Sequence, residues 1–163
     1  HVQLLGSGTI LREVEAAAEL LEKEWAVSAD VWSATSFNEL RRDMDDCVRW
    51  NRLNPGQKAR SCYVAECLSE KKGPVIAATD YVRLYADQIR AAVPGKYHVL
   101  GTDGYGRSDT RQALRSFFEV DRAHIVVAAL QSLADNGQLP DKIVSEAIKK
   151  YGIDGSKPNP ATI

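Results

Sequence analysis

A chain of 163 residues, of which 44% are hydrophobic and 26% charged, is long enough to bury one core and short enough to be a single domain. Its 21 basic and 22 acidic side chains give a formal net charge of −1. This balance argues against nucleic acid and against an anionic membrane surface as partners.

The cysteines and the N-terminus bear on where the protein works. Three cysteines is an odd number, and their spacing matches no zinc motif, so we expect reduced thiols in a cytoplasmic protein. No run approaches the ~20 apolar residues of a membrane span, and the N-terminus lacks the layout of a signal peptide. Because His1 already opens a strand-like segment without an initiator Met, we expect a piece of a larger protein.

The first half of the chain alternates strand-like and helix-like segments. Apolar residues at a period of about 3.6 follow Thr9, which is the expected helix cap. Ser36 and Glu39 have the form of a capping box at the start of the next helix. The expected elements are a strand over Val2–Leu5, a helix over Ile10–Trp25, a strand over Asp30–Ala34, a helix over Phe37–Trp50 and a short helix over 63–68.

The second half continues the alternation and then becomes helical. A helix over 82–93 is expected to stop at Pro94-Gly95, and Ser108 or Asp109 is the expected cap of the helix after the last strand. Residues 155–163 are expected to form a loose tail. The other expected elements are strands over Val75–Ala78 and Tyr97–Leu100 and helices over Asp109–Phe118, Arg122–Asp135 and Pro140–Tyr151.

This alternation predicts an α/β fold with three layers, α/β/α, in one domain over residues 1–163. Parallel strands need crossover connections, and right-handed crossovers place helices on both faces of the sheet. We expect about four or five strands in a mostly parallel sheet, and the pattern leaves a mixed sheet open.

The glycine-rich loop Gly101–Ser108 follows a strand and leads into a helix, a junction where α/β proteins often bind ligands. A second such junction, Gly6-Ser7-Gly8, lacks the third glycine of a dinucleotide-binding fingerprint. Asp30 lies at the beginning of the next strand, the wrong end for a ribose contact. A structural turn is therefore the favoured interpretation of Gly6–Gly8.

The sequence signals for a metal site or a catalytic site are also weak. Asp103 and Asn136, about thirty residues apart, superficially match an Asp–Asn pair that holds a divalent metal at a diphosphate, but the residues beside Asp103 do not fit. His98 and His124 have no evident partners, and we expect both to be structural. Ser36, Ser108 and Cys47 have no recognisable base, so caps and core positions explain them better than nucleophilic roles.

Arginines recur along the helix after the glycine-rich loop. Arg107, Arg111 and Arg115 are spaced by four residues, which places them on one face. A solvated helix face is the simpler interpretation, and a docking surface for another domain or subunit is the alternative.

The glycine-rich loop also carries a family resemblance. The segment Gly101–Asp121 resembles the C-terminal domain of the homodimeric pyruvate dehydrogenase first component, the thiamine-dependent decarboxylating subunit. A looser pattern of the transketolase superfamily is matched by Tyr105, Gly106, Ser108 and Leu114. Further stretches are similar in the same order: Val2–Val14, Thr35–Leu40, Arg49–Asn51, Ala77–Tyr81, Val99–Gly104 and Tyr151–Asp154.

The resemblance implies an assembly domain of a larger enzyme. Such an enzyme decarboxylates pyruvate and reductively acetylates a lipoyl group of the dihydrolipoyl acyltransferase, with thiamine diphosphate and Mg²⁺ held by other domains of a homodimer. No catalytic, cofactor-binding or metal-binding residue is therefore expected in this chain, and the isolated chain is expected to be inactive. The residues expected to dock other domains or the dimer partner are Asp80, Tyr81, Asp103, Tyr105, Arg107, Ser108 and Arg111.

Two other functions remain open at this stage. One is an independent module that binds a small ligand at the sheet edge near Gly6, Asp80 and Gly104. The other is the same domain in a different 2-oxo acid dehydrogenase or in a transketolase-like enzyme.

Overall fold

The computed structural model describes all 163 residues, and its centre is a parallel sheet of four strands in the order β2-β1-β3-β4. All three neighbouring pairs are parallel, which confirms the expected parallel sheet. Both faces of the two central strands are buried, as their continuous apolar sequences require. The strands are β1 (Val2–Gly6), β2 (Ala29–Ser33), β3 (Val75–Ala78) and β4 (Tyr97–Leu100).

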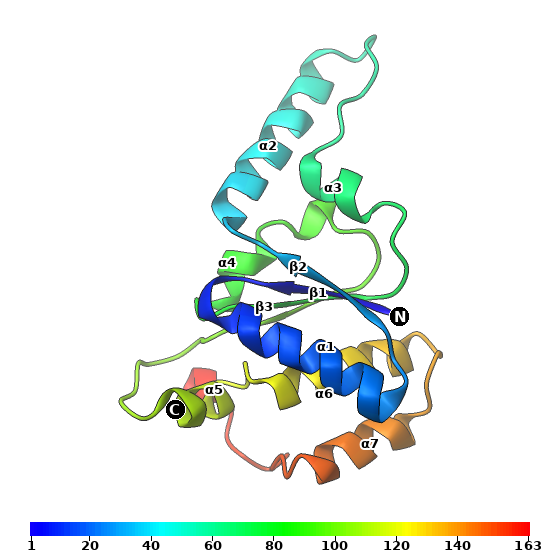
Figure 1. Ribbon diagram of the computed structural model, residues 1–163. Helices are drawn as coiled ribbons and strands as arrows, with labels where there is room; N and C mark the ends of the chain where they lie inside the picture. Colours follow the sequence, from blue (N-terminus) through cyan, green and yellow to red (C-terminus); the bar gives the residue numbers. More distant parts are fainter.

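Helices cover both faces of this sheet, which confirms the three expected layers (Figure 1). The chain moves from β1 outward to β2 and then returns past β1 to β3 and β4, so right-handed crossovers put the first connection on one face and the next two on the other. One layer contains α1 (Leu11–Trp25), α6 (Arg122–Asp135) and α7 (Asp141–Lys150). The other contains α2 (Phe37–Leu53), α3 (Tyr63–Leu68) and α4 (Arg83–Asp87).

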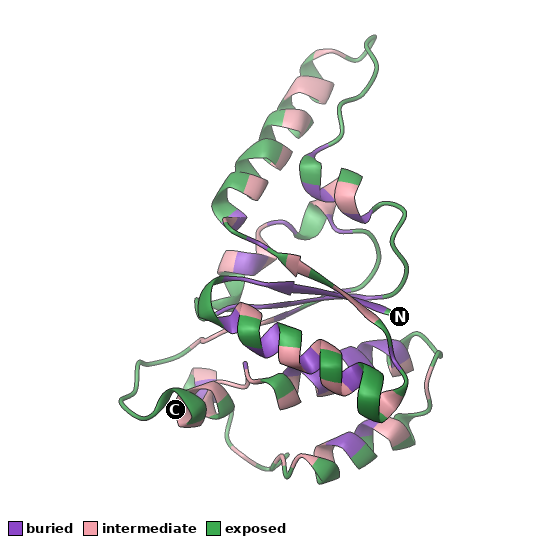
Figure 2. Cartoon of the chain, in the orientation of Figure 1, coloured by how far each residue is buried: buried purple, intermediate pink, exposed green.

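Two cores lie on the two faces of the sheet. Successive side chains of a strand point to opposite faces, so Leu4 and Ile76 pack against α1 and α6 whereas Leu5 and Ala77 pack in the other core. Figure 2 shows this burial running through the central strands and along one side of α1 and α6. Every central strand therefore contributes to both cores.

The connection from β2 to β3 projects from the domain, and we call residues 37–62 the α2 arm (Figure 1). Only Phe37 of its helix is buried. The returning segment lies along the helix because the Asn51 side chain donates to the Arg60 carbonyl at 2.9 Å and accepts from the Arg60 amide at 2.7 Å. The Arg60 guanidinium lies over the Trp50 ring, 4.1 Å from its centroid.

Three expected helix boundaries differ from the structure, two of them because a side chain has another partner. Thr9 does not cap α1; it lies in a short 3₁₀ turn, Gly8–Ile10, and its hydroxyl donates to Asp80 at 3.4 Å. The helix that we expected to end at Trp50 continues to Leu53. In α5 (Arg111–Phe117) the cap is neither Ser108 nor Asp109, since Thr110 accepts the Ala113 amide at 3.3 Å.

The helix expected over 82–93 was also wrong, because the structure divides it into α4 and a 3₁₀ turn, Arg90–Ala92. The Tyr97 hydroxyl donates to the Ala86 carbonyl at 2.8 Å. That carbonyl is the one an uninterrupted helix would pair with the amide of Arg90, so the tertiary bond explains the break.

The expected loose tail is partly ordered. Pro160–Thr162 form a 3₁₀ turn, and Pro160 is buried. Gly104 has a φ of +105°, and a Cβ placed there would lie 2.4 Å from the Pro160 carbonyl oxygen. The turn therefore packs closely on the glycine-rich loop. None of the helices combines the length and hydropathy needed to cross a membrane.

Candidate functional site

The residues that were predicted from the sequence to bind a ligand or another domain follow the carboxyl ends of the strands. The chain leaves β1 in one direction and returns to build β3 on its other side, so the sheet has its topological switch point between these two strands. A buried hydrogen bond from Ser7 to Thr79, 2.8 Å between the hydroxyl oxygens, joins the loops after them.

The loop after β4 is attached to the loop after β3. The backbone amide of Thr102 donates to the Tyr81 carbonyl at 2.8 Å, and the Thr102 hydroxyl donates to the Asp80 carbonyl at 2.8 Å. Asp103 forms an ion pair with Arg83. The structure therefore brings Asp80, Tyr81 and Asp103 together at the sheet edge.

The other predicted residues lie farther out. Tyr105 is 80% exposed at the projecting loop, and Tyr81 is 60% exposed. Ser108 is exposed and makes no side-chain hydrogen bond. The Arg107 guanidinium lies 4.6 Å from the centroid of the Phe117 ring, whereas Arg111 is exposed on α5 without an ion-pair partner.

An open groove, which we call the switch-point groove, lies between the loop after β4, α5 and the 3₁₀ turn before α1. Its polar lining includes Thr9, Thr102, Arg107, Arg111 and Arg115. Its apolar lining comes from Ile10, Leu114, Phe118 and Val120. Asp80 is its one acidic lining residue.

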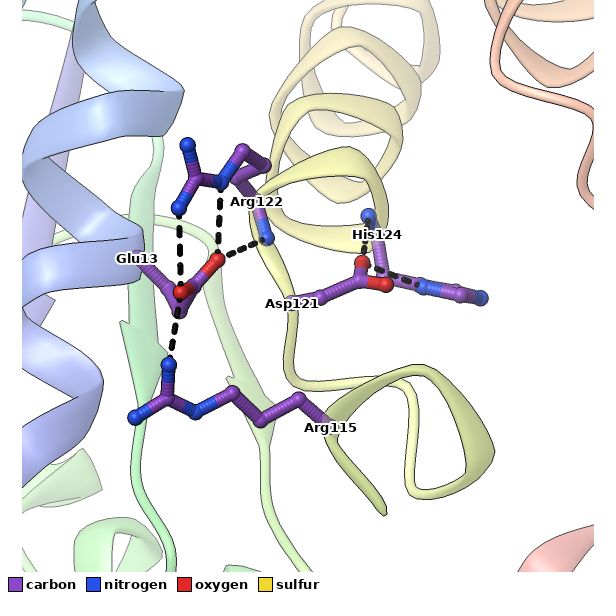
Figure 3. Close-up of polar contacts among 5 residues, drawn as sticks. All are labelled: Glu13, Arg115, Asp121, Arg122 and His124. Carbon is purple, nitrogen blue, oxygen red and sulfur yellow. Dashed lines mark hydrogen bonds and ion pairs between the residues drawn. The ribbon is translucent and has the colours of Figure 1, made fainter. Parts of the chain in front are cut away.

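A buried carboxylate, Glu13, holds two arginines beside this groove (Figure 3). It accepts from Arg115 Nη1 at 2.8 Å and from Arg122 Nε, Nη2 and backbone amide at 2.9, 3.2 and 3.1 Å. Burial alone would raise the pKa of Glu13, but the Arg122 hydrogen bonds and the positive charges of Arg122 and Arg115 lower it overall. Glu13 thus fixes α1 to α5 and α6.

Asp121 is a second carboxylate near Glu13, and it pairs with His124 (Figure 3). It caps α6 by accepting the His124 backbone amide at 3.0 Å, and it contacts His124 Nδ1 at 2.7 Å. Burial opposes ionisation of Asp121, yet its bonds to His124 lower its pKa overall. His124 therefore belongs to a helix cap, as expected for a structural histidine.

Glu13 and the two threonines of the groove were not predicted from the sequence as site residues. Glu13 follows Ile10 by three residues and precedes Val14, so it lies on the apolar face of its helix. A carboxylate in that position was a detectable sign of a buried cationic partner. Nothing local in the sequence identified which arginines would supply it.

The weaker sequence candidates do not assemble into a site. A Cβ on Gly6 would lie 2.8 Å from the Leu11 Cα, so close packing explains this glycine. Asp103 lies beyond the carboxyl end of β4, whereas Asn136 follows Asp135, which pairs at 3.8 Å with Lys96 before the amino end of that strand. The Asp–Asn pair is thus at opposite ends of the sheet and does not fit a metal-bound diphosphate.

Catalytic and metal-binding groups are likewise separated. No three His, Cys, Asp or Glu side chains are grouped as metal ligands would be. All three cysteines are free, as the sequence analysis expected.

Comparisons with known sequences agree with the family resemblance. The chain is 65% identical over 161 residues to the pyruvate dehydrogenase E1 component of Pseudomonas aeruginosa, covering 98% of the chain and 18% of that protein. It is 57% identical over 163 residues to the component of Cupriavidus necator, and 52% identical over 160 residues to that of Escherichia coli K12. These alignments cover 100% and 98% of the chain, and the chain spans only 18% of each relative's length.

A solved structure supports the fold, and a family profile identifies the family. A split-gene transketolase, described as an inactive β4 tetramer, superposes with a TM-score of 0.55 at 19% identity, over 82% of this chain and 39% of that one. The profile of the transketolase-like TK C-terminal domain matches residues 1–121. The chain belongs to the transketolase-like C-terminal domain family.

Proposed function

We propose that this chain is the C-terminal assembly domain of a pyruvate dehydrogenase E1 component. The observation that carries the proposal is the 65% identity to one such component along 98% of the chain. The parent enzyme decarboxylates pyruvate and transfers the acetyl unit reductively to a lipoyl group. The high identity to E1 components favours this parent over another 2-oxo acid dehydrogenase or a transketolase.

The chemistry of the parent resides outside this chain. Thiamine diphosphate, with Mg²⁺, supplies the carbanion stabilisation that decarboxylation requires. Asp103 is already paired with Arg83, and no cluster of metal-ligating side chains is available to hold that cofactor. We therefore assign thiamine diphosphate and Mg²⁺ to other domains of a cytoplasmic homodimer that delivers acetyl groups to the dihydrolipoyl acyltransferase.

The contribution of this domain is a docking surface at the carboxyl edge of the sheet. Exposed apolar side chains lie on the segments that follow β3 and β4: Leu84 in α4 is 73% exposed, Val82 50%, Tyr81 60% and Tyr105 80%. The charged and polar residues Asp80, Asp103, Arg107, Ser108 and Arg111 lie on the same two segments. A mixed aromatic and charged surface of this kind is typical of protein interfaces.

Replacing Tyr105 in the full-length enzyme tests the docking role. We expect Tyr105→Ala to weaken assembly about 5- to 30-fold, because a buried aromatic contact contributes about 1–2 kcal/mol or more at an interface. Analytical ultracentrifugation and the turnover of pyruvate measure this loss. Tyr63→Ala is the control, since Tyr63 is similarly exposed, at 63%, but lies at the base of the α2 arm. Unchanged assembly and turnover in Tyr105→Ala would contradict the docking role.

A calorimetric titration of the 163-residue chain with thiamine diphosphate and MgCl₂ tests the assignment of chemistry to other domains. We expect no saturable heat. Binding at about micromolar Kd, equivalent to ~8 kcal/mol, would require a cofactor site within this chain and would overturn the assignment.

A further inference from the structure

The switch-point groove has the position of a ligand site. In open parallel sheets, ligands bind outside the carboxyl ends of the strands at which the chain reverses direction. The groove lies at this reversal between β1 and β3, and Thr9 and Thr102 line it from the loops after β1 and β4. The groove borders the docking surface: it shares Asp80, Arg107 and Arg111 with that surface, whereas Tyr81, Leu84 and Tyr105 are not among its lining residues.

The charge of the groove is positive despite the nearly neutral chain. Arg107, Arg111 and Arg115 line it, against the single carboxylate of Asp80, which faces the Thr9 hydroxyl at 3.4 Å. Neither Arg107 nor Arg111 has a carboxylate partner in the structure. Only Arg115 is paired, at 2.8 Å from Glu13, and this pairing fixes its position.

The groove also has an apolar side. Ile10, Leu114 and Phe118 line it next to the arginines. A ligand that fits both parts carries a compact anionic group joined to an apolar one. Guanidinium groups match the oxygens of a phosphate through paired N–H donors, and the charges of Arg107 and Arg111, which no carboxylate offsets by pairing, suit a doubly charged group better than a single carboxylate.

We propose that the switch-point groove binds a phosphorylated small molecule. Its phosphate lies among Arg107, Arg111 and Arg115, and its apolar part covers Ile10 and Phe118. This is a ligand site of the domain itself, in addition to the assembly role proposed above.

Titration with phenyl phosphate, inorganic phosphate and benzoate at matched ionic strength tests the site. We expect phenyl phosphate to bind the chain with a Kd of about 1 mM or lower, inorganic phosphate more weakly and benzoate most weakly. Isothermal calorimetry measures the affinities, and amide chemical shifts locate the ligand near Thr9, Thr102 and Arg111. Arg111→Gln is expected to weaken phenyl phosphate about tenfold, the loss of one charge-assisted bond.

Arg52→Gln is the matched control, because Arg52 is exposed in the last turn of α2 and the substitution removes the same charge. Arg52 and Arg111 are both exposed, so we expect both variants to remain folded, which circular dichroism checks. Three outcomes would overturn the proposal. Arg111→Gln and Arg52→Gln could weaken phenyl phosphate binding equally, phenyl phosphate could show no saturable binding, or benzoate could bind as tightly as phenyl phosphate. Binding that disappears in the full-length enzyme would also overturn it. Because phenyl phosphate binding is measured on the 163-residue chain and docking as assembly of the full-length enzyme, failure here is separable from failure of the docking role.

Discussion

Glu13 joins the first helix of the chain to two helices of its second half. A carboxylate that is 5% exposed remains charged because both of its oxygens accept hydrogen bonds from arginine. These bonds join α1, formed early in the chain, to residues more than one hundred positions later. Removing the negative charge would leave Arg115 and Arg122 facing each other without compensation.

Glu13→Gln is therefore expected to destabilise the domain. The substitution keeps the size of the side chain but removes its charge, and we expect a loss of about 1–3 kcal/mol in the free energy of unfolding. Urea denaturation followed by circular dichroism measures it. Glu15→Gln, an exposed neighbour on α1, should change the same quantity by less than about 0.5 kcal/mol. Equal effects of the two substitutions would contradict the role of Glu13.

The lowered pKa of Glu13 predicts acid sensitivity. Because its folded-state pKa lies below the unfolded value of about 4.3, its stabilisation is complete above that value and is lost as the pH falls through the folded pKa. The free energy of unfolding should thus decline from about pH 5 toward pH 3. In Glu13→Gln this decline should be shallower, with Asp121 accounting for part of what remains. Parallel pH profiles in the two proteins would show that Glu13 does not contribute.

At the scale of elements, local sequence signals predicted which helices form better than they predicted where each helix ends. Ser36 caps α2 as expected, accepting the Glu39 amide at 3.2 Å, because the residues involved are neighbours in sequence. The break after α4 depends on Tyr97, eleven positions beyond the carbonyl that it binds. The C-terminal turn could not be anticipated either, since Pro160 is ordered by contact with Gly104, a distant part of the chain.

Gly104→Ala tests how the C-terminal turn is held. The new Cβ would approach the Pro160 oxygen to 2.4 Å at a backbone with φ of +105°, so the turn or the loop must shift. We expect a destabilisation of about 1–3 kcal/mol and faster hydrogen exchange at the Thr162 amide, which donates to the Asn159 carbonyl at 2.9 Å. Gly106→Ala is the matched control, with nothing within 4 Å of its Cβ. The idea fails if both substitutions have the same effect on stability and exchange.

At the scale of the molecule, the alternation of strands and helices was sufficient to predict the three layers and the parallel sheet. The switch-point groove was not predictable in the same way. Arg107, Arg111 and Arg115 were expected on one helix face, but Thr9 and Ile10 lie far from them in the sequence. The strand order that brings the two segments together depends on which crossover passes over which face.

Sharing of β1 and β3 between the two cores predicts cooperative unfolding. Leu4 supports one core and its neighbour Leu5 the other, so neither helical layer can separate without exposing a strand that the other layer covers. The amide signals of Leu21 in α1 and of Ile89 in the opposite layer should therefore lose native intensity at the same urea concentration. Heteronuclear NMR across a urea series measures both in one sample. Native signals that persist in one layer after those of the other have disappeared would show two independent units, and would place the weaker layer outside the cooperative fold.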